Sequence, residues 1–297
     1  MCYCGQQKVF EEASEHIDKL LQIEVNAKQI ERVCHHYGKG IEQEQSKAIE
    51  VGALQANPDK QSCYVMVDGS MIFTREEGWK EIKLGRIFQK DSCIQINANR
   101  RMIETSQYVC HLGNHQEFTR KMEYYLDSIH EKIVIADGAK WIWNWVESTY
   151  PEAIQILDFF HAKEHLFNFA HLQFSDEAEK KLWTEEQTLL LLNDEVEQVI
   201  GNLKHIKPNK KTRKSLKQLI CYYQAHKDRM KYKTFREKKL LIGSGPIESA
   251  HRNVIQQRLK LSGQRWTIEG AQQVANLRVM HKSNNWNVVL NLIRNAA

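Results

Sequence analysis

The chain has 297 residues, of which 42% are hydrophobic and 27% are charged, and its formal net charge is +5 at pH 7. This length allows one large domain or two smaller ones with a substantial core. No run approaches the length of apolar sequence that a transmembrane helix needs, and the first residues lack the pattern of a secretory signal, so we predict a cytoplasmic protein without a membrane partner.

Cysteine usage supports the same compartment. The seven cysteines are odd in number and lack the spacing of a disulfide framework, which predicts free thiols. Cys2, Cys4 and the run Cys34-His35-His36 do not have the ligand spacing of familiar zinc sites, and we interpret them as buried thiols and a polar helix face.

Residues 10–56 have helical periodicity and contain no proline. Asn26 is a suitable N-cap for the second of two helices. The pair resembles a helix-turn-helix, which can place its second helix in a DNA groove, but many plain helical hairpins share this pattern and we favour the plain hairpin. We therefore predict a helical N-terminal region over residues 1–57.

After the turn predicted at Asn57-Pro58-Asp59, the pattern of hydrophobic residues becomes typical of β-strands. Strands are expected at 63–67, 79–88 and 104–112, followed by a helix at 118–129, a strand at 132–136, a helix at 140–149 and a strand at 153–157. This order predicts a mixed α/β fold with a five-stranded mixed sheet of the ribonuclease H-like plan, filling residues 58–160. In that plan the first and fourth strands lie side by side and parallel.

The second half of the chain is expected to be helical. Residues 161–240 show no strand-like alternation and predict an all-helical insertion, and residues 241–297 predict a further helix that begins near Pro246, then a helical tail. Between Lys204 and Lys239 there are fourteen Lys or Arg against two acids, a charge of +12, and from Ser249 onward seven more stand against Glu269 alone, a charge of +6. Such segregation is typical of a surface that binds nucleic acid, although a solvated helical face is the alternative.

Three carboxylates stand at comparable places in this plan. Asp68-Gly69 and Asp137-Gly138 each follow an apolar strand, and Glu248 follows Gly245 at the start of a helix. Each alone has an ordinary explanation, because Asp-Gly is a common turn and an acid favours a helix N-terminus. Together they predict a site for Mg²⁺ or Mn²⁺, with two ions relieving the repulsion of the three carboxylates and activating a phosphoryl transfer.

At this point the chain resembles a known family. It is similar to bacterial insertion-sequence transposases of the DDE class, closest to the Kra group. The matching blocks lie between residues 68 and 266 and are Asp68-Gly69-Ser70, Gly78-Trp79-x-Glu81-x-Lys83-Leu84-Gly85, Ala136-Asp137-Gly138-Ala139-x-Trp141-Ile142-Trp143-Asn144, Tyr150-Pro151, Ile156-Leu157-Asp158-Phe159-x-His161-Ala162-x-Glu164-His165, Gly243-Ser244-Gly245-x-x-Glu248-Ser249 and Arg258-x-Lys260-x-Ser262-Gly263-x-Arg265-Trp266.

The resemblance implies roles for individual residues. Asp68, Asp137 and Glu248 would be the catalytic and metal-binding triad. Asp158 and His161 match an accessory Asp-x-x-His pair, in which His161 orients DNA or a carboxylate or else caps a helix. The expected DNA contacts, from the basic residues after the third carboxylate, are Arg252, Arg258, Lys260 and Arg265. Trp141, Trp143 and Trp145 could stack on flipped bases or pack within a helix, and we favour packing for Trp141 and Trp145.

The implied function is a DNA transposase that cuts transposon ends and joins them to target DNA, acting on double-stranded DNA as a homo-oligomer in the nucleoid. The alternatives are a hydrolytic nuclease on the same core and an inactive remnant that only binds DNA. Families of this kind have a longer region before the helical hairpin, which predicts weakened recognition of the terminal repeats by this chain.

Overall fold

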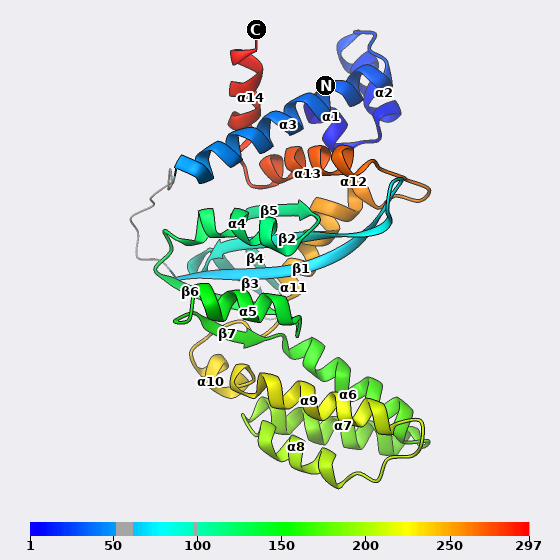
Figure 1. The fold of residues 1–297 in the computed structure, drawn as a ribbon, viewed down its shortest axis with the longest axis vertical. Coiled ribbons are helices and arrows are strands. Elements are labelled where there is room, and N and C mark those ends of the chain that lie inside the picture. Colours follow the sequence, from blue (N-terminus) through cyan, green and yellow to red (C-terminus); the bar gives the residue numbers. More distant parts are fainter. Residues whose placement is uncertain (52–61, 98–99, 297) are drawn as a thin grey trace. The chain divides into compact units, whose positions relative to one another are not determined.

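The computed structural model describes residues 1–51, 62–97 and 100–296 (Figure 1). The chain forms two compact units: the first unit comprises Met1–Lys132 and Pro246–Ala297, and the second unit comprises Ile133–Gly245. This division differs from the predicted boundaries. Residues 1–51 pack with the residues that follow them in the first unit, and residues 133–160 cluster with the helical insertion.

The strands β1 (Ser62–Thr74), β2 (Gly78–Gln89), β5 (Gln107–Leu112), β6 (Glu131–Ala136) and β7 (Ile154–Leu157) form one sheet in the order β5-β2-β1-β6-β7. The pairs β1–β2 and β2–β5 are antiparallel and β6–β7 is parallel. The predicted mixed α/β fold with a five-stranded mixed sheet is confirmed. Its ribonuclease H-like identity stays a prediction.

The first strand does not end where the sequence predicts. β1 continues through Asp68 and Gly69 as far as Thr74, with Asp68 opposite Leu84, so this Asp-Gly is not a turn. Pairing with Leu84 and Lys83 of β2 keeps both residues in the strand, and glycine is needed here because a Cβ at Gly69 would stand 2.2 Å from Oε1 of Glu81. The chain turns instead just before Gly78, which has a φ of +69°.

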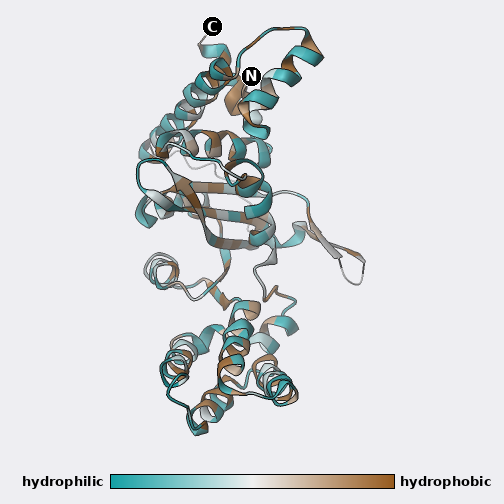
Figure 2. Ribbon diagram, turned by 90° about the vertical axis from the view of Figure 1, so that its right-hand side faces the viewer, coloured by the Kyte–Doolittle hydropathy of each residue, from teal (hydrophilic) through white to brown (hydrophobic). Residues whose placement is uncertain are grey.

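The predicted third strand is also shorter than expected, because β5 begins only at Gln107. Before it, the 3₁₀ turn Lys90–Ser92 leads into β3 (Cys93–Asn97) and β4 (Arg100–Ile103), which form a separate two-stranded antiparallel sheet. Figure 2 shows this hairpin projecting from the hydrophobic strands of the main sheet.

The two predicted N-terminal helices form as α2 (Phe10–Leu21) and α3 (Ala27–Val51), and a short helix that was not predicted, α1 (Cys2–Gln7), precedes them. Asn26 caps α3 as predicted, since its Oδ1 accepts the backbone amide of Gln29 at 2.8 Å. The long α3 packs against α13 (Ile268–Lys282), where Gly38 approaches so closely that a Cβ would lie 2.3 Å from the Gln273 carbonyl oxygen. One face of α3 is therefore core, and recognition of DNA by this helix stays a prediction.

Among the remaining helices of the first unit, α4 (His115–Leu126) packs on β2 and β5, α13 packs on β5, and α14 (Trp286–Asn295) packs on α3 and α13. α4 is capped by Asn114, whose Oδ1 accepts the amide of Glu117, and its Met122 fills the space above Gly85 of β2. The C-terminal segment forms α11 (Gly245–Ala250), a π-helix η3 (His251–Gln256), α12 (Gln257–Leu259), α13 and α14.

Apart from β6 and β7, all the regular elements of the second unit are helices or 3₁₀ turns. Its helices are α5 (Lys140–Thr149), α6 (Phe159–Gln173), α7 (Glu177–Leu192), α8 (Val196–His205), α9 (Arg213–His226), the 3₁₀ turn Lys227–Arg229 and α10 (Tyr232–Glu237). The predicted helical structure of residues 161–240 is confirmed, and its role as an insertion into a ribonuclease H-like core stays a prediction. Its core includes Tyr223, whose hydroxyl donates to the Ala162 carbonyl at 2.7 Å. Across the described part of the chain, no helix combines the length and apolarity needed to cross a membrane.

Candidate active site

In the first unit, Asp68 lies on one face of the β1–β2 pair together with Arg86. Side chains alternate along a strand, and residues opposite each other on neighbouring strands point to the same face. Asp68 faces the same way as its partner Leu84 and hence as Arg86, two residues further along β2. The Asp68 side chain is 32% exposed, and its Oδ1 accepts the backbone amide of Gly69 at 2.7 Å. The carboxylate is thus oriented by its own backbone and reachable by solvent.

The helix that carries Glu248 packs on this face. The Arg86 guanidinium donates to the Pro246 carbonyl at 2.7 Å, which fixes the first turn of α11 against β2. His251 continues the same helical segment, and its Nε2 lies 3.6 Å from Oδ2 of Asp68. Glu248 lies one turn before His251 and is exposed, so the first and third predicted carboxylates belong to packed neighbouring elements.

His251 is a residue that the sequence reasoning missed. It is only 3% exposed, and burial lowers its pKa more than the attraction of Asp68 raises it, so the imidazole is neutral near pH 7. Neither ring nitrogen has a hydrogen-bond partner among the described residues, because 3.6 Å is too long for one. The spacing Glu248-x-x-His251 was the signal that could have pointed to it.

Arg258 corrects a prediction. Instead of offering its guanidinium to a phosphate, it is 1% exposed and lies between the rings of Phe10 and Trp266, 4.7 and 4.8 Å from their centroids. Its Nε donates to the Gly5 carbonyl at 3.0 Å, and burial lowers its pKa to about 10. Arg258 therefore holds the N-terminal helices to the C-terminal segment. The other expected DNA contacts, Arg252, Lys260 and Arg265, are exposed and stay predictions.

A second buried arginine holds the π-helix. Arg278 of α13 is 2% exposed and donates to the carbonyl oxygens of Asn253 and Val254, and to that of Gln6 at 2.5 Å. A π-helix changes the register of the backbone hydrogen bonds, and Arg278 supplies donors to carbonyls inside that irregular segment. The π-helix that follows Glu248 is thereby held from the neighbouring helix α13.

In the second unit, Asp137 directly follows β6. Its Oδ1 accepts the amide of Ala139 at 2.9 Å, and its carbonyl accepts the indole N–H of Trp143 at 2.7 Å. A Cβ at Gly138 would stand 2.3 Å from the ring of Tyr222 on α9, which accounts for the glycine. Burial, and then the charge of Asp137, raises the pKa of Tyr222, so its hydroxyl is neutral. This Asp-Gly does leave the strand, as predicted.

The tryptophans near Asp137 are packing residues where the structure defines their burial. Trp143 is 2% exposed and Trp145 is 7% exposed. The preference for packing at Trp145 is confirmed, and Trp143 likewise has no exposed face on which a base could stack.

Asp158 is a buried structural carboxylate. It is 0% exposed, and its Oδ1 accepts the amide of His161 at 2.8 Å as the N-cap of α6. Its Oδ2 accepts the amide of Ser244, and the neighbouring Phe159 amide donates to the Ile242 carbonyl at 2.9 Å. Asp158 thus ties the start of α6 to the segment that leads into α11. Of the two residues in the Asp-x-x-His pair it is the aspartate that caps the helix, and His161 lies 3.7 Å away.

Replacing Asp158 with Ala is expected to lower the free energy of unfolding by about 2 kcal/mol, because two buried amides lose their charged acceptor. Thermal unfolding followed by circular dichroism measures this loss. Asp158→Asn keeps one acceptor and should lose less, and His161→Ala should leave the melting temperature unchanged. Equal losses for Asp158→Ala and His161→Ala would contradict this role.

His226 makes the second unit sensitive to acid. Its ring is 6% exposed, its Nδ1 lies 3.1 Å from a guanidinium nitrogen of Arg229, and burial followed by the charge of Arg229 lowers its pKa to about 4. An unfolded histidine titrates near 6.5, so between about pH 6.5 and pH 4 only the unfolded state gains this proton. The contribution of His226 to stability is complete above pH 6.5 and is lost as the pH falls toward 4, by about 2 kcal/mol.

The variant His226→Gln tests this dependence, since glutamine can accept from Arg229 but does not titrate. The fall in melting temperature from pH 7 to pH 4.5 should be smaller in the variant than in the native chain. His111, whose pKa burial also lowers to about 4, is present in both proteins and cancels in the difference. Identical pH profiles would rule out His226 as a source of acid sensitivity.

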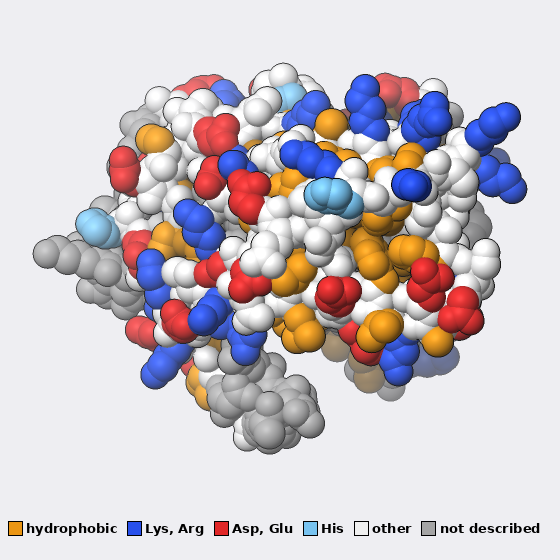
Figure 3. Space-filling view, turned by 90° about the horizontal axis from the view of Figure 1, so that it is seen from below, with side chains coloured by type: hydrophobic (Ala, Val, Ile, Leu, Met, Phe, Trp, Pro, Cys, Tyr) orange, Lys and Arg blue, Asp and Glu red, His pale blue; other side chains and the backbone are white. Residues whose placement is uncertain are grey.

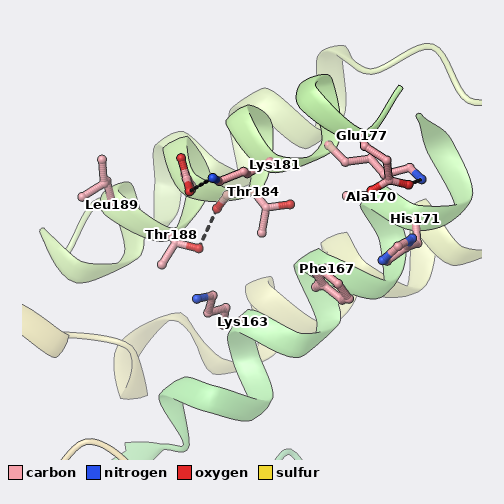
Figure 4. Close-up of a pocket in the computed structure, with 11 residues that line it drawn as sticks. Lys163, Phe167, Ala170, His171, Glu177, Lys181, Thr184, Thr188 and Leu189 are labelled. Carbon is pink, nitrogen blue, oxygen red and sulfur yellow. Dashed lines mark hydrogen bonds and ion pairs between the residues drawn. The ribbon is translucent and has the colours of Figure 1, made fainter. Parts of the chain in front are cut away.

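The second unit also contains a pocket of about 490 Å³ between α6 and α7. Figure 4 shows Lys163 and Phe167 of α6 facing Thr184 and Thr188 of α7 across it. Lys180 and Lys181 are paired with Glu177 and Glu185. None of the predicted site residues lines this pocket, and it offers a mixed, largely neutralised surface.

The chemistry of the predicted ligands suits a hard divalent cation. Asp68, Asp137 and Glu248 offer carboxylate oxygens, the donors that Mg²⁺ and Mn²⁺ prefer. Asp68 and Glu248 belong to the first unit and Asp137 to the second. Within the described ranges, no cluster of three or more His, Cys, Asp or Glu side chains is assembled as a metal site.

No curated protein matches the chain. The sequence model of an uncharacterised protein family, UPF0236, matches residues 8–289, which run from α2 into the first turn of α14 and include every candidate site residue. The chain therefore belongs to the uncharacterised protein family UPF0236.

Proposed function

We propose that the chain is a DDE transposase that cuts transposon ends and joins them to target DNA, with Asp68, Asp137 and Glu248 as its catalytic carboxylates. The observation that carries the proposal is the contact of His251 with Asp68, which packs the helix bearing Glu248 on the strand bearing Asp68. A site built from a strand aspartate and a glutamate from a distant C-terminal helix is what the sequence pattern predicts. Asp137, at the end of a strand in the second unit, supplies the remaining carboxylate.

In this proposal the three carboxylates would together hold two ions of Mg²⁺ or Mn²⁺, a task that suits the charge and the oxygen donors of these side chains. The bound metal would activate an attacking water or 3′-hydroxyl and stabilise the leaving oxygen of a phosphodiester. The backbone amides of Gly69 and Ala139 each fix one oxygen of Asp68 and Asp137, and so orient the carboxylates. Burial lowers the pKa of His251, so this ring adds no positive charge beside Asp68 near pH 7 and does not compete with a cation there.

Exposed cations support DNA as the substrate. Seven Lys and Arg residues between the end of α8 and the middle of α9 are exposed, and no acidic residue interrupts them: Lys204, Lys207, Lys210, Lys211, Arg213, Lys214 and Lys217. Lys and Arg side chains also gather along the upper right edge of the face drawn in Figure 3. A row of cations without acids attracts a phosphate backbone, because each neutralised phosphate releases a counterion.

A strand-transfer assay tests the proposal. The purified chain is incubated with Mg²⁺ or Mn²⁺, a labelled duplex carrying the inverted repeat that flanks its gene, and a supercoiled target plasmid. Joined products are expected, and they require both metal and repeat. Cutting without joining would identify a hydrolytic nuclease, and binding without cutting would identify an inactive DNA-binding protein. Analytical ultracentrifugation with the same duplex tests the proposed homo-oligomer on DNA.

A further inference from the structure

A second pocket lies in the first unit, where the β1–β2 hairpin meets the loop between α12 and α13. Its volume is about 380 Å³, within the range of small-molecule sites. Its lining includes the side chains of two aromatic residues, Phe73 and Trp79, and of two basic residues, Lys260 and Arg265. Phe73 comes from β1, whereas Trp79 on the one hand and Lys260 and Arg265 on the other come from two of the sequence blocks that carry the family resemblance. These blocks lie far apart along the chain and meet here.

The backbone of this pocket is held in place. The amide of Arg75 donates to the Trp266 carbonyl at 2.8 Å, and the amide of Trp266 donates to the Phe73 carbonyl at 3.2 Å, so the loop adds a short parallel bridge to the hairpin. The Arg75 guanidinium donates to the Arg265 carbonyl at 3.2 Å. Gly263, with a φ of +75°, allows the loop to turn back toward the hairpin. These backbone contacts hold the walls of the pocket in a defined arrangement.

Trp79 is the unusual residue in the pocket. It is 64% exposed although it belongs to a paired strand. The Phe73 ring meets it edge-on, with centroids 5.5 Å apart and planes at 85°. A ring held edge-on by its neighbour is restrained while much of its surface stays open to solvent, and an aromatic face of this kind is a stacking platform.

Cations line the pocket. Lys260 and Arg265 are exposed, and the Arg265 guanidinium lies 5.8 Å from the centroid of the Phe73 ring. Three nearby acids are already engaged: Glu76 accepts the amide of Ile268, Glu77 pairs with Lys80, and Glu81 of β2 pairs with Lys83. An open aromatic face beside two exposed cations suits a nucleotide, whose base stacks and whose phosphates carry negative charge.

We propose that this pocket binds one unpaired nucleotide of a DNA strand, with the base stacked on Trp79 and the flanking phosphates on Lys260 and Arg265. The inference deepens the proposed function and rests on it only in taking DNA as the ligand. Arg265 and Lys260 supply sequence-independent affinity, and Trp79 supplies a preference for a base that has left the duplex.

The experiment compares two fluorescent duplexes that differ at a single bulged position, one with an unpaired adenine and one with an abasic residue. The full-length chain is expected to bind the adenine duplex roughly 5- to 100-fold more tightly, the range of base–aromatic stacking. Trp79→Ala should abolish this difference, and Trp79→Phe should keep most of it. Phe167→Ala, which removes an exposed ring in the second unit, is the matched control and should behave as the native chain.

The cation variants separate the two parts of the site. Lys260→Gln and Arg265→Gln should weaken binding of both duplexes equally, and each should lower the slope of log affinity against log salt by about one. Melting temperatures confirm that each variant is folded, which is expected because the changed side chains are exposed.

Two results would overturn the proposal: a native chain that binds both duplexes equally, or a Trp79→Ala variant that still prefers the adenine. If the pocket binds a protein partner instead of a nucleotide, the native chain should bind both duplexes equally. Neither result bears on the proposed function, because strand transfer by the native chain is measured in a separate assay. Conversely, a Trp79-dependent preference in a chain without strand-transfer activity would support the pocket and refute the transposase.

Discussion

Replacing Asp68 or Asp137 with Asn is expected to reduce strand transfer by at least about 10³-fold while leaving the fold intact. The substitution removes the negative charge that would hold the metal, and loss of several kcal/mol of transition-state stabilisation corresponds to a factor of this size. Asparagine keeps the shape of the side chain and one acceptor oxygen, so it can still accept the amides of Gly69 and Ala139 that orient the native carboxylates. The measurement is the single-turnover rate of joining with a pre-cleaved transposon end, which removes the cutting step.

Asp91→Asn is the matched control, since Asp91 is exposed in a 3₁₀ turn outside the site, and it should transfer strands at the native rate. The double variant Asp68→Asn with Asp137→Asn is the sharper test. If carboxylates from the two units act on the same metal site, the second substitution adds little to the loss caused by the first. Losses that multiply would mean that the two aspartates act independently, and transfer within tenfold of native in Asp68→Asn would refute the triad.

Much of the fold could be predicted because it follows from periodicity and order. The run of strands and helices from β1 to β7 gave a mixed five-stranded sheet, and the absence of alternation after residue 160 gave the helical insertion. Asn26 and Pro246 marked helix starts through their local chemistry. These features depend on residues close together in the chain, where single-sequence reasoning has its information.

The extent of β1 could not be predicted in the same way. Asp68-Gly69 has the local signature of a turn, but pairing with Leu84 and Lys83 of β2 keeps it in the strand, and those partners are distant in the sequence. Asp137-Gly138 has the same signature and does end its strand. Identical dipeptides thus adopt different structures under different cross-strand partners.

The buried arginines were missed for a related reason. A basic residue in a basic segment is expected at the surface. No local pattern around Arg258 indicates that its guanidinium lies between the rings of Phe10 and Trp266. Arg278 finds its acceptors in a π-helix, an irregularity that no local pattern predicts. His251 is buried by the same packing. Sequence patterns therefore nominate the three carboxylates, which stay a prediction as a site, whereas they give no sign of the buried His251, Arg258 and Arg278.

Replacing Arg278 with Met is expected to lower the free energy of unfolding by at least about 3 kcal/mol. Methionine fills a similar apolar volume but donates no hydrogen bond, so the carbonyls of Gln6, Asn253 and Val254 lose a buried donor, each at a cost of about 1–3 kcal/mol. For a protein of this size the loss corresponds to a fall in melting temperature of roughly 6–12 °C. Differential scanning calorimetry measures it.

Arg278→Lys retains one cationic donor and should recover part of the loss, whereas Arg252→Met, an exposed change on the same π-helix, should stay within about 0.5 kcal/mol of native. Because Arg278 fixes the segment that follows Glu248 and His251, strand transfer by Arg278→Met should also fall at temperatures where the variant is still folded. A folded Arg278→Met chain with native activity would show that the packing of α13 positions Glu248 without these hydrogen bonds, and an unchanged melting temperature would show that the guanidinium does not stabilise the π-helix.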